Sequence, residues 1–180
     1  MKKVFALLLI SFMAVSCLFA APVSDTIGFF IRWRHVVAGS ETMEVLEYDG
    51  ENELENNTKI IEIKGGQQNV AMLKLTTNIS GLYTLVYHAT ALQTQDGTAA
   101  VGYKLYFDHE GMVANISVGD DPGTTYPLSG MPTASTSFTV PTGIASPAVK
   151  EILIKAELQE YTEMRAGTYG STIIIERVIN

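Results

Sequence analysis

Cysteine is almost absent from the chain, which has one, Cys17, among its 180 residues. A disulfide within the chain needs two cysteines, so none can form. Small exported domains that cannot build a sufficient apolar core usually depend on disulfides. This chain must instead be stabilised by burial of apolar side chains, and 47% of its residues are hydrophobic.

Basic residues are scarce as well. The chain has 12 Lys and Arg against 19 Asp and Glu, which gives a formal net charge of −7 at pH 7. Nucleic acids and anionic membrane surfaces are bound through clusters of Lys and Arg. The composition therefore excludes both as main partners of this protein.

The sequence also lacks a recognisable set of catalytic or metal-binding residues. His35, His88 and His109 are isolated, with no second His or Cys at metal-ligand spacing. There is no Gly-x-Ser-x-Gly nucleophile motif. The acidic stretches at 49–55 and 120–121 do not match a calcium-loop pattern. We expect a protein that is not an enzyme and has no cofactor and no metal site.

No apolar run reaches the roughly 20 residues that a membrane-spanning helix requires. The shorter run at 4–15 follows Lys2 and Lys3 and precedes the small residues Ala20 and Ala21. This order is typical of a secretory signal peptide, which we predict at 1–21. Removing 21 of the 180 residues leaves 159, and loss of the two lysines changes the net charge from −7 to −9. Residues 22–180 are then expected to form one domain.

Cys17 is a candidate for lipidation because it occupies the position of the lipidated cysteine in bacterial lipoprotein signals. Such signals usually have Leu three positions earlier, where this chain has Ala14. The alternative is that Cys17 is an ordinary part of the signal and is removed with it. Either way we expect an exported protein of the periplasm, outer membrane or surface of a bacterium.

After the signal the dominant pattern is alternation of apolar and polar residues in short runs rich in Val, Ile, Thr, Tyr and Phe, which is typical of strands. Strands are predicted at 26–37, 42–48, 59–64, 69–76, 82–92, 99–107, 113–118, 136–140, 148–158 and 171–178. The residues of 151–161 also favour helix, but their clean alternation favours a strand. Asp49-Gly50, Gly65-Gly66 and Asp96-Gly97 predict tight turns.

These strands predict an all-β fold, an antiparallel two-sheet sandwich of the immunoglobulin-like type. An up-and-down barrel is the alternative, but the long Pro-rich excursion at 120–147 fits Greek-key connections better. The inward side of each strand supplies the expected core: Val70, Met72, Leu73, Leu75, Leu82, Leu85, Tyr87, Tyr103, Leu105, Phe107, Ile152, Ile154, Ile173 and Ile175.

Four stretches carry a family resemblance. The strand–turn–strand run "NVAMLKLTTNISGLYTLVY" at 69–87 and the Tyr-rich strand "YKLYFD" at 103–108 are followed at the chain's end by "AGTYGSTIIIERV" at 166–178, and "TIGFFIRWRHV" at 26–36 follows the signal. The order resembles the pilin-like subunits of bacterial chaperone/usher systems and the spore coat protein U family, over about half of the mature chain.

The resemblance implies an incomplete sandwich whose open groove is filled by a strand from a chaperone or from the next subunit. The donor candidate in this chain is the alternating set Ile27, Phe29, Ile31 and Trp33. The alternative is that this segment is simply the first strand of a complete sandwich, with Trp33 buried between exposed arginines. A glycan-binding role for Trp33 is less favoured.

Two functions follow as expectations. The first is a structural or adhesive envelope subunit, pilin-like or coat-like, whose partners are other subunits or a chaperone joined by strand addition. The second is a monomeric periplasmic or lipid-anchored module that binds a glycan, a small molecule or a protein, with its site beneath the excursion at 120–147.

Overall fold

The structure is a computed structural model that describes residues 26–34, 41–62, 65–120, 132–143, 146–158 and 167–179. The predicted signal peptide and Cys17 lie outside the described residues. So do His35 and, within the Pro-rich excursion, residues 121–131 and 144–145; the rest of the excursion includes β10 (Thr133–Val140).

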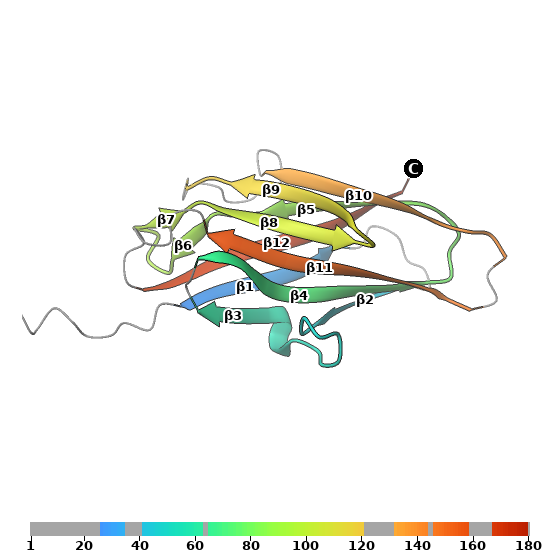
Figure 1. The fold of residues 1–180 in the computed structure, drawn as a ribbon, viewed down its shortest axis with the longest axis horizontal. Coiled ribbons are helices and arrows are strands. Elements are labelled where there is room, and N and C mark those ends of the chain that lie inside the picture. Colours follow the sequence, from blue (N-terminus) through green and yellow to red (C-terminus); the bar gives the residue numbers. More distant parts are fainter. Residues whose placement is uncertain are drawn as a thin grey trace, which may run out of the picture.

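The strands form two sheets packed face to face, as Figure 1 shows. In sheet A the order is β10-β5-β12-β1-β3, and β6 pairs with β12 and β7. These strands are β1 (Thr26–Arg34), β3 (Thr58–Glu62), β5 (Gly81–Ala89), β6 (Leu92–Thr94), β7 (Ala100–Val101), β10 (Thr133–Val140) and β12 (Thr168–Ile179). In sheet B the order is β2-β4-β11-β8-β9. These are β2 (Glu41–Leu46), β4 (Gly66–Thr77), β8 (Tyr103–His109), β9 (Met112–Val118) and β11 (Ala148–Leu158).

The all-β two-sheet fold predicted from alternation is confirmed. An up-and-down arrangement requires that neighbouring strands follow one another in the chain. Among the described strands only the pairs β6–β7 and β8–β9 do so, and the other neighbours are joined by crossovers. The segment 148–158 is the strand β11 rather than a helix, with buried and half-buried residues alternating along it. The only helical element within the described ranges is one 3-10 turn, η2 (Glu55–Asn57).

One strand pair departs from the antiparallel prediction. β1 runs parallel to β12 from Thr26↔Thr168 to Arg34↔Glu176 and antiparallel to β3 on its other side. The alternation of side chains predicts that a segment is a strand, but it is identical for parallel and antiparallel neighbours. The direction of pairing is therefore decided by how the chain returns to the sheet.

Met72 and Leu82 were wrongly predicted to lie in the core. β4 is irregular where its pairing with β11 shifts between Ile154 and Lys155, and Val70 and Ala71 are both buried there. The extra residue of such a bulge reverses the alternation, so Met72 faces outward and is half-buried. Leu82 is 48% exposed because the inward residues of β5 are its odd-numbered ones.

The other twelve predicted core residues are buried, and the core adds aromatic side chains that join the sheets. Tyr87 of sheet A stacks on Phe107 of sheet B with ring centroids 3.9 Å apart. Within sheet A, Tyr83 of β5 stacks on Phe138 of the neighbouring β10 at 5.3 Å. Close packing of such large rings contributes much of the apolar burial that a chain without disulfides requires.

The predicted turns adopt the backbone that glycine permits. Gly50 and Gly97 have φ of 79° and 68°, in the left-handed region that L side chains rarely adopt. A further turn joins β8 to β9, where Glu110 and Gly111 have φ of 51° and 84°. Asp108 accepts a hydrogen bond from the Gly111 backbone N–H at 3.0 Å.

Candidate functional site

The place that β1 occupies in sheet A is the first candidate site, and we call it the β1 slot. It lies between β12 and β3, and Figure 1 shows β1, in blue, running beside β3. Phe29 and Ile31 point into the core and are fully buried. The register places Phe29 opposite Ser171 and Ile31 opposite Ile173. On the outer face, the exposed Arg32 lies over the Phe30 ring at 4.9 Å.

A buried polar group, the Tyr103 hydroxyl, lies beneath β1 on the core side of the slot. The Phe29 ring lies 5.8 Å from the Tyr103 ring, which reaches across from sheet B. The Tyr103 hydroxyl donates to the Thr90 carbonyl at 2.9 Å and lies 2.5 Å from the Ser171 hydroxyl. Burial raises the pKa of Tyr103, so the hydroxyl stays protonated. The floor of the slot is therefore apolar, and its polar atoms are paired.

A second buried polar cluster closes one end of the sandwich, and we call it the clasp. Its members are Glu41 of β2, Thr77 of β4, Tyr83 of β5 and Arg177 of β12. Glu41 Oε2 accepts from Arg177 Nη1. Glu41 Oε1 accepts from the Tyr83 hydroxyl at 2.5 Å and from the Thr77 hydroxyl at 3.0 Å. Burial raises the pKa of Tyr83, and the Glu41 carboxylate adds to this effect.

The clasp was not predicted, although one signal for it was present. Ile173 and Ile175 were placed inward on the last strand, and the same alternation places Arg177 inward too. An inward Arg needs a carboxylate partner, because an unpaired buried charge is strongly unfavourable. Nothing in the sequence around Glu41 identifies it as that partner, since the two residues lie 136 positions apart.

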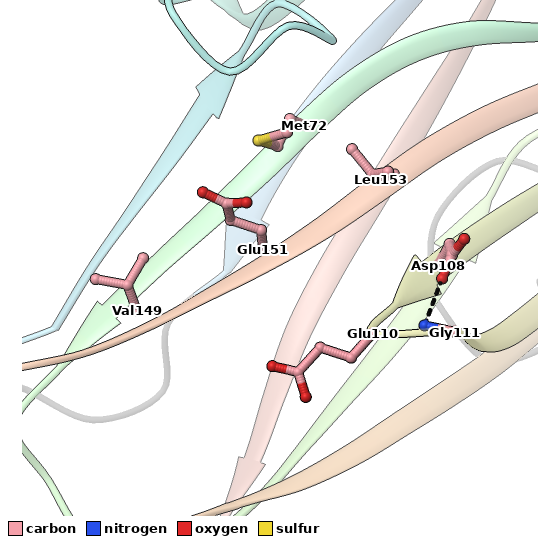
Figure 2. A pocket seen from close by; sticks show the side chains of 7 residues that line it. All are labelled: Met72, Asp108, Glu110, Gly111, Val149, Glu151 and Leu153. Atoms are coloured by element: carbon pink, nitrogen blue, oxygen red, sulfur yellow. Dashed lines mark hydrogen bonds between the residues drawn. The ribbon is translucent and has the colours of Figure 1, made fainter.

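The third candidate is a hollow on the outer face of sheet B, with a volume of about 570 Å³. It is lined by Met72, Asp108, Glu110, Gly111, Val149, Glu151 and Leu153. Figure 2 shows Glu151 rising from β11 beside Met72, with Asp108 at the opposite rim bonded to Gly111. The hollow thus combines an apolar floor with three carboxylates.

The carboxylates of the hollow are not arranged for a metal ion. Glu110 pairs with Lys150 at 2.9 Å, and this hydrogen bond holds the pKa of Glu110 below its usual range. Asp108 is engaged in the turn. Within the part of the chain that the structure describes, no three His, Cys, Asp or Glu side chains are grouped for a metal ion.

The two described histidines lie apart and have separate partners. His88 Nε2 lies 3.1 Å from Glu176 Oε2 on β12. His109 is fully buried, and its Nδ1 lies 2.9 Å from the Glu151 carbonyl. The hydrogen bonds of the two rings go to a carboxylate and a backbone carbonyl, not to a hydroxyl or a thiol.

The predicted donor set is placed only in part. All four residues of the set lie on β1, and Phe29 and Ile31 face the core. The side chains of Ile27 and Trp33 lie outside the described residues. In the acidic stretch at 49–55, Asp49 caps its own turn by accepting from the Glu51 N–H at 3.0 Å.

No model of a known protein family matches the chain, and no curated protein matches it. No helix among the described residues has both the length and the apolar character needed to cross a lipid bilayer. The features of the described chain that can support a function are the β1 slot, the clasp and the hollow.

Proposed function

We propose that this protein is an exported structural or adhesive subunit of a bacterial envelope that assembles by exchanging β1 between copies. The observation that carries the proposal is the place of β1. It is the first described strand, yet it fills an interior position in sheet A beside β12, the last one. No described strand precedes β1 in the chain, so its withdrawal pulls no described strand ahead of it out of place.

The slot has what recognition of a strand requires. β12 and β3 offer backbone hydrogen-bonding groups on both sides of β1, and these fix a strand of any sequence. Specificity comes from the two buried side chains, Phe29 and Ile31, each of which stabilises the bound strand by about 1.5–3 kcal/mol.

An empty slot would expose two strand edges and an apolar floor, which most proteins avoid because such edges pair with other chains. In the described state the chain fills its own slot. Assembly would replace that β1 with the β1 of another copy, as in domain swapping, or with a strand from a chaperone. The proposal assigns no catalytic residue and no cofactor.

The first test is the assembly state of protein isolated from cells that produce it, on a detergent gel with and without heating. We expect a ladder of multiples that heating collapses to one band. Deleting residues 25–37 should leave a folded monomer that forms no ladder. A single band under both conditions, or a deletion variant that is unfolded, would show that β1 is an integral strand.

The second test uses the intact chain and a labelled synthetic peptide of residues 26–34. Incubation with excess peptide should give an adduct that survives detergent but not heat. The matched control is the same peptide with Phe29 and Ile31 replaced by Ser, which keeps the backbone and removes the buried side chains. Equal labelling by both peptides would mean nonspecific adhesion and contradict exchange through the slot.

The second candidate function is a binding module, and the hollow on sheet B favours it. The Glu151 carboxylate, beside Met72 and Leu153, suits a cationic group carried on an apolar stem, whereas Glu110 is already paired with Lys150. The probe is an amidated Leu-Lys-Leu peptide, titrated while backbone amide resonances are recorded. Shifts should be confined to β4, β8, β11 and the turn between β8 and β9, and they should weaken in Glu151→Gln but not in the control Glu55→Gln. An equal response in both variants would exclude the hollow.

A further inference from the structure

The clasp stands apart from the β1 slot in its composition. Glu41, Thr77, Tyr83 and Arg177 come from β2, β4, β5 and β12, so no member belongs to β1. Two of these strands are in sheet A and two in sheet B. The clasp therefore connects the two sheets by a route that does not pass through β1.

The clasp is also strongly buried. The side chains of Arg177 and Glu41 are 5% and 1% exposed. Both Glu41 oxygens accept hydrogen bonds from other clasp members, and the Arg177 guanidinium lies over the Tyr83 ring at 4.1 Å. Removing one partner of such a pair leaves an uncompensated buried charge and is strongly destabilising. The pair therefore fixes how the sheets face each other at this end.

The clasp lies next to the end of the β1 slot. The pairing of β1 with β12 ends at Arg34↔Glu176, and the next residue of β12 is Arg177. The described chain resumes after β1 at Glu41, the first residue of β2. The two charged residues of the clasp thus flank the end of the slot, one on each sheet.

We propose that the clasp holds the two sheets in register while β1 is out of its slot, so that exchange passes through an open but folded domain. This inference rests on the proposed exchange of β1. Apolar packing specifies one arrangement less strictly than a paired charge does, because apolar cores tolerate repacking when their volume and pattern are kept. A buried ion pair has one partner and one geometry, which makes it suited to this role.

The experiment is native-state hydrogen exchange of the full chain, read peptide by peptide by mass spectrometry. In the wild type, β1 amides should exchange through a local opening, faster than the amides of β4, β5 and β11, which exchange through global unfolding. Glu41→Gln should accelerate exchange in those three strands roughly 100-fold and leave β1 unchanged, because the open state keeps the clasp.

The matched control is Glu47→Gln, which makes the same change in a half-exposed pair with Lys59. Its effect on the hydrogen-exchange rate should be less than about 5-fold in every strand.

If the amides of β1 and of the three core strands exchange hydrogen at the same rate in the wild type, the proposed strand exchange of β1 fails, and the inference falls with it. If β1 is faster in the wild type but Glu41→Gln accelerates it as much as the core, the clasp breaks on opening. That result would overturn the inference and leave the exchange of β1 standing. The same conclusion would follow if Glu41→Gln left the exchange rates of the β4, β5 and β11 amides unchanged.

Discussion

β1 and β11 both occupy interior positions in their sheets, but they are held in different ways. β11 pairs with β4 along its whole length and with β8 from Leu153 onward, antiparallel on both sides. β1 pairs with β12 in parallel, and with β3 only over 26–30. β11 also has strands before and after it in the chain, whereas β1 is the first described strand. Under the proposed exchange, β1 fills an interior place in its sheet and can still be withdrawn from it.

The largest expected effect is that of Ile154→Ala in β11. Ile154 is fully buried, so the cavity should lower the free energy of unfolding by about 2–5 kcal/mol. Urea denaturation measures this loss. Exchange should accelerate in β4, β5 and β8 while the local opening of β1 is unaffected, because β11 is intact in both the closed and the open state. Faster exchange of β1 in this variant would erase the contrast between the two strands.

Ile31→Ala in β1 is the matched substitution and should give a different pattern. Ile31 is equally buried, so global stability should fall by a similar amount, about 2–5 kcal/mol. The contacts of Ile31 are absent once β1 has opened, so β1 amides should accelerate together with the core amides. Hydrogen exchange that left β1 at its wild-type rate would contradict the assignment of Ile31 to the slot.

Unfolding at alkaline pH tests how much Tyr87 stabilises the fold. Tyr87 joins the two sheets by stacking on Phe107 of β8, the neighbour of β11. Burial raises the pKa of Tyr87 from its ordinary value of 10.0 to about 12. The contribution of Tyr87 to the free energy of unfolding is therefore complete below pH 10. It is lost as the pH rises from 10 towards 12, because in that range Tyr87 ionises in the unfolded chain before it does so in the folded one. The loss should reach about 2–3 kcal/mol, seen by urea denaturation across that range. Tyr87→Phe should flatten this part of the pH profile, and an unchanged profile would exclude Tyr87 as its source.

The smallest expected effect is at the turn between β8 and β9. Gly111 has a φ of 84°, with open space around its Cα, so Gly111→Ala introduces backbone strain without a steric clash. The free energy of unfolding should fall by about 1 kcal/mol, as measured by thermal unfolding, and the hydrogen-exchange rates of the β1 amides should not change. The control is Gly119→Ala, which has the same open space and no positive φ. Equal losses in the two variants would refute the strain argument.

Much of the fold could be predicted because alternation is a local property of strands. The bounds of β11 match the prediction at both ends, and Ile152 and Ile154 are buried as expected. The same reasoning failed at Met72, where a bulge shifts the alternation, and at Leu82, which lies on the outer face of β5. A bulge depends on how two distant strands pair, which one segment alone does not reveal.

The candidate sites also differ in how far one segment of the sequence reveals them. The apolar alternation of Phe29 and Ile31 marked the slot segment in the sequence, but the hollow on sheet B was not expected. Its lining comes from β4, β8 and β11, which are separated in the chain and adjacent only in the sheet. The predicted site beneath the excursion at 120–147 stays a prediction, since residues 121–131 and 144–145 lie outside the described residues.

The amino-acid sequence by itself determined that this chain forms strands, where most of them lie and, apart from exceptions such as Met72 and Leu82, which of their apolar side chains point inward. It could do so because side-chain alternation and turn residues act over a few neighbouring positions. Only the tertiary structure decided that β1 lies parallel to β12 and that Glu41 and Arg177 meet across the sandwich. Those contacts join residues more than a hundred positions apart, and they depend on the path of the whole chain between them.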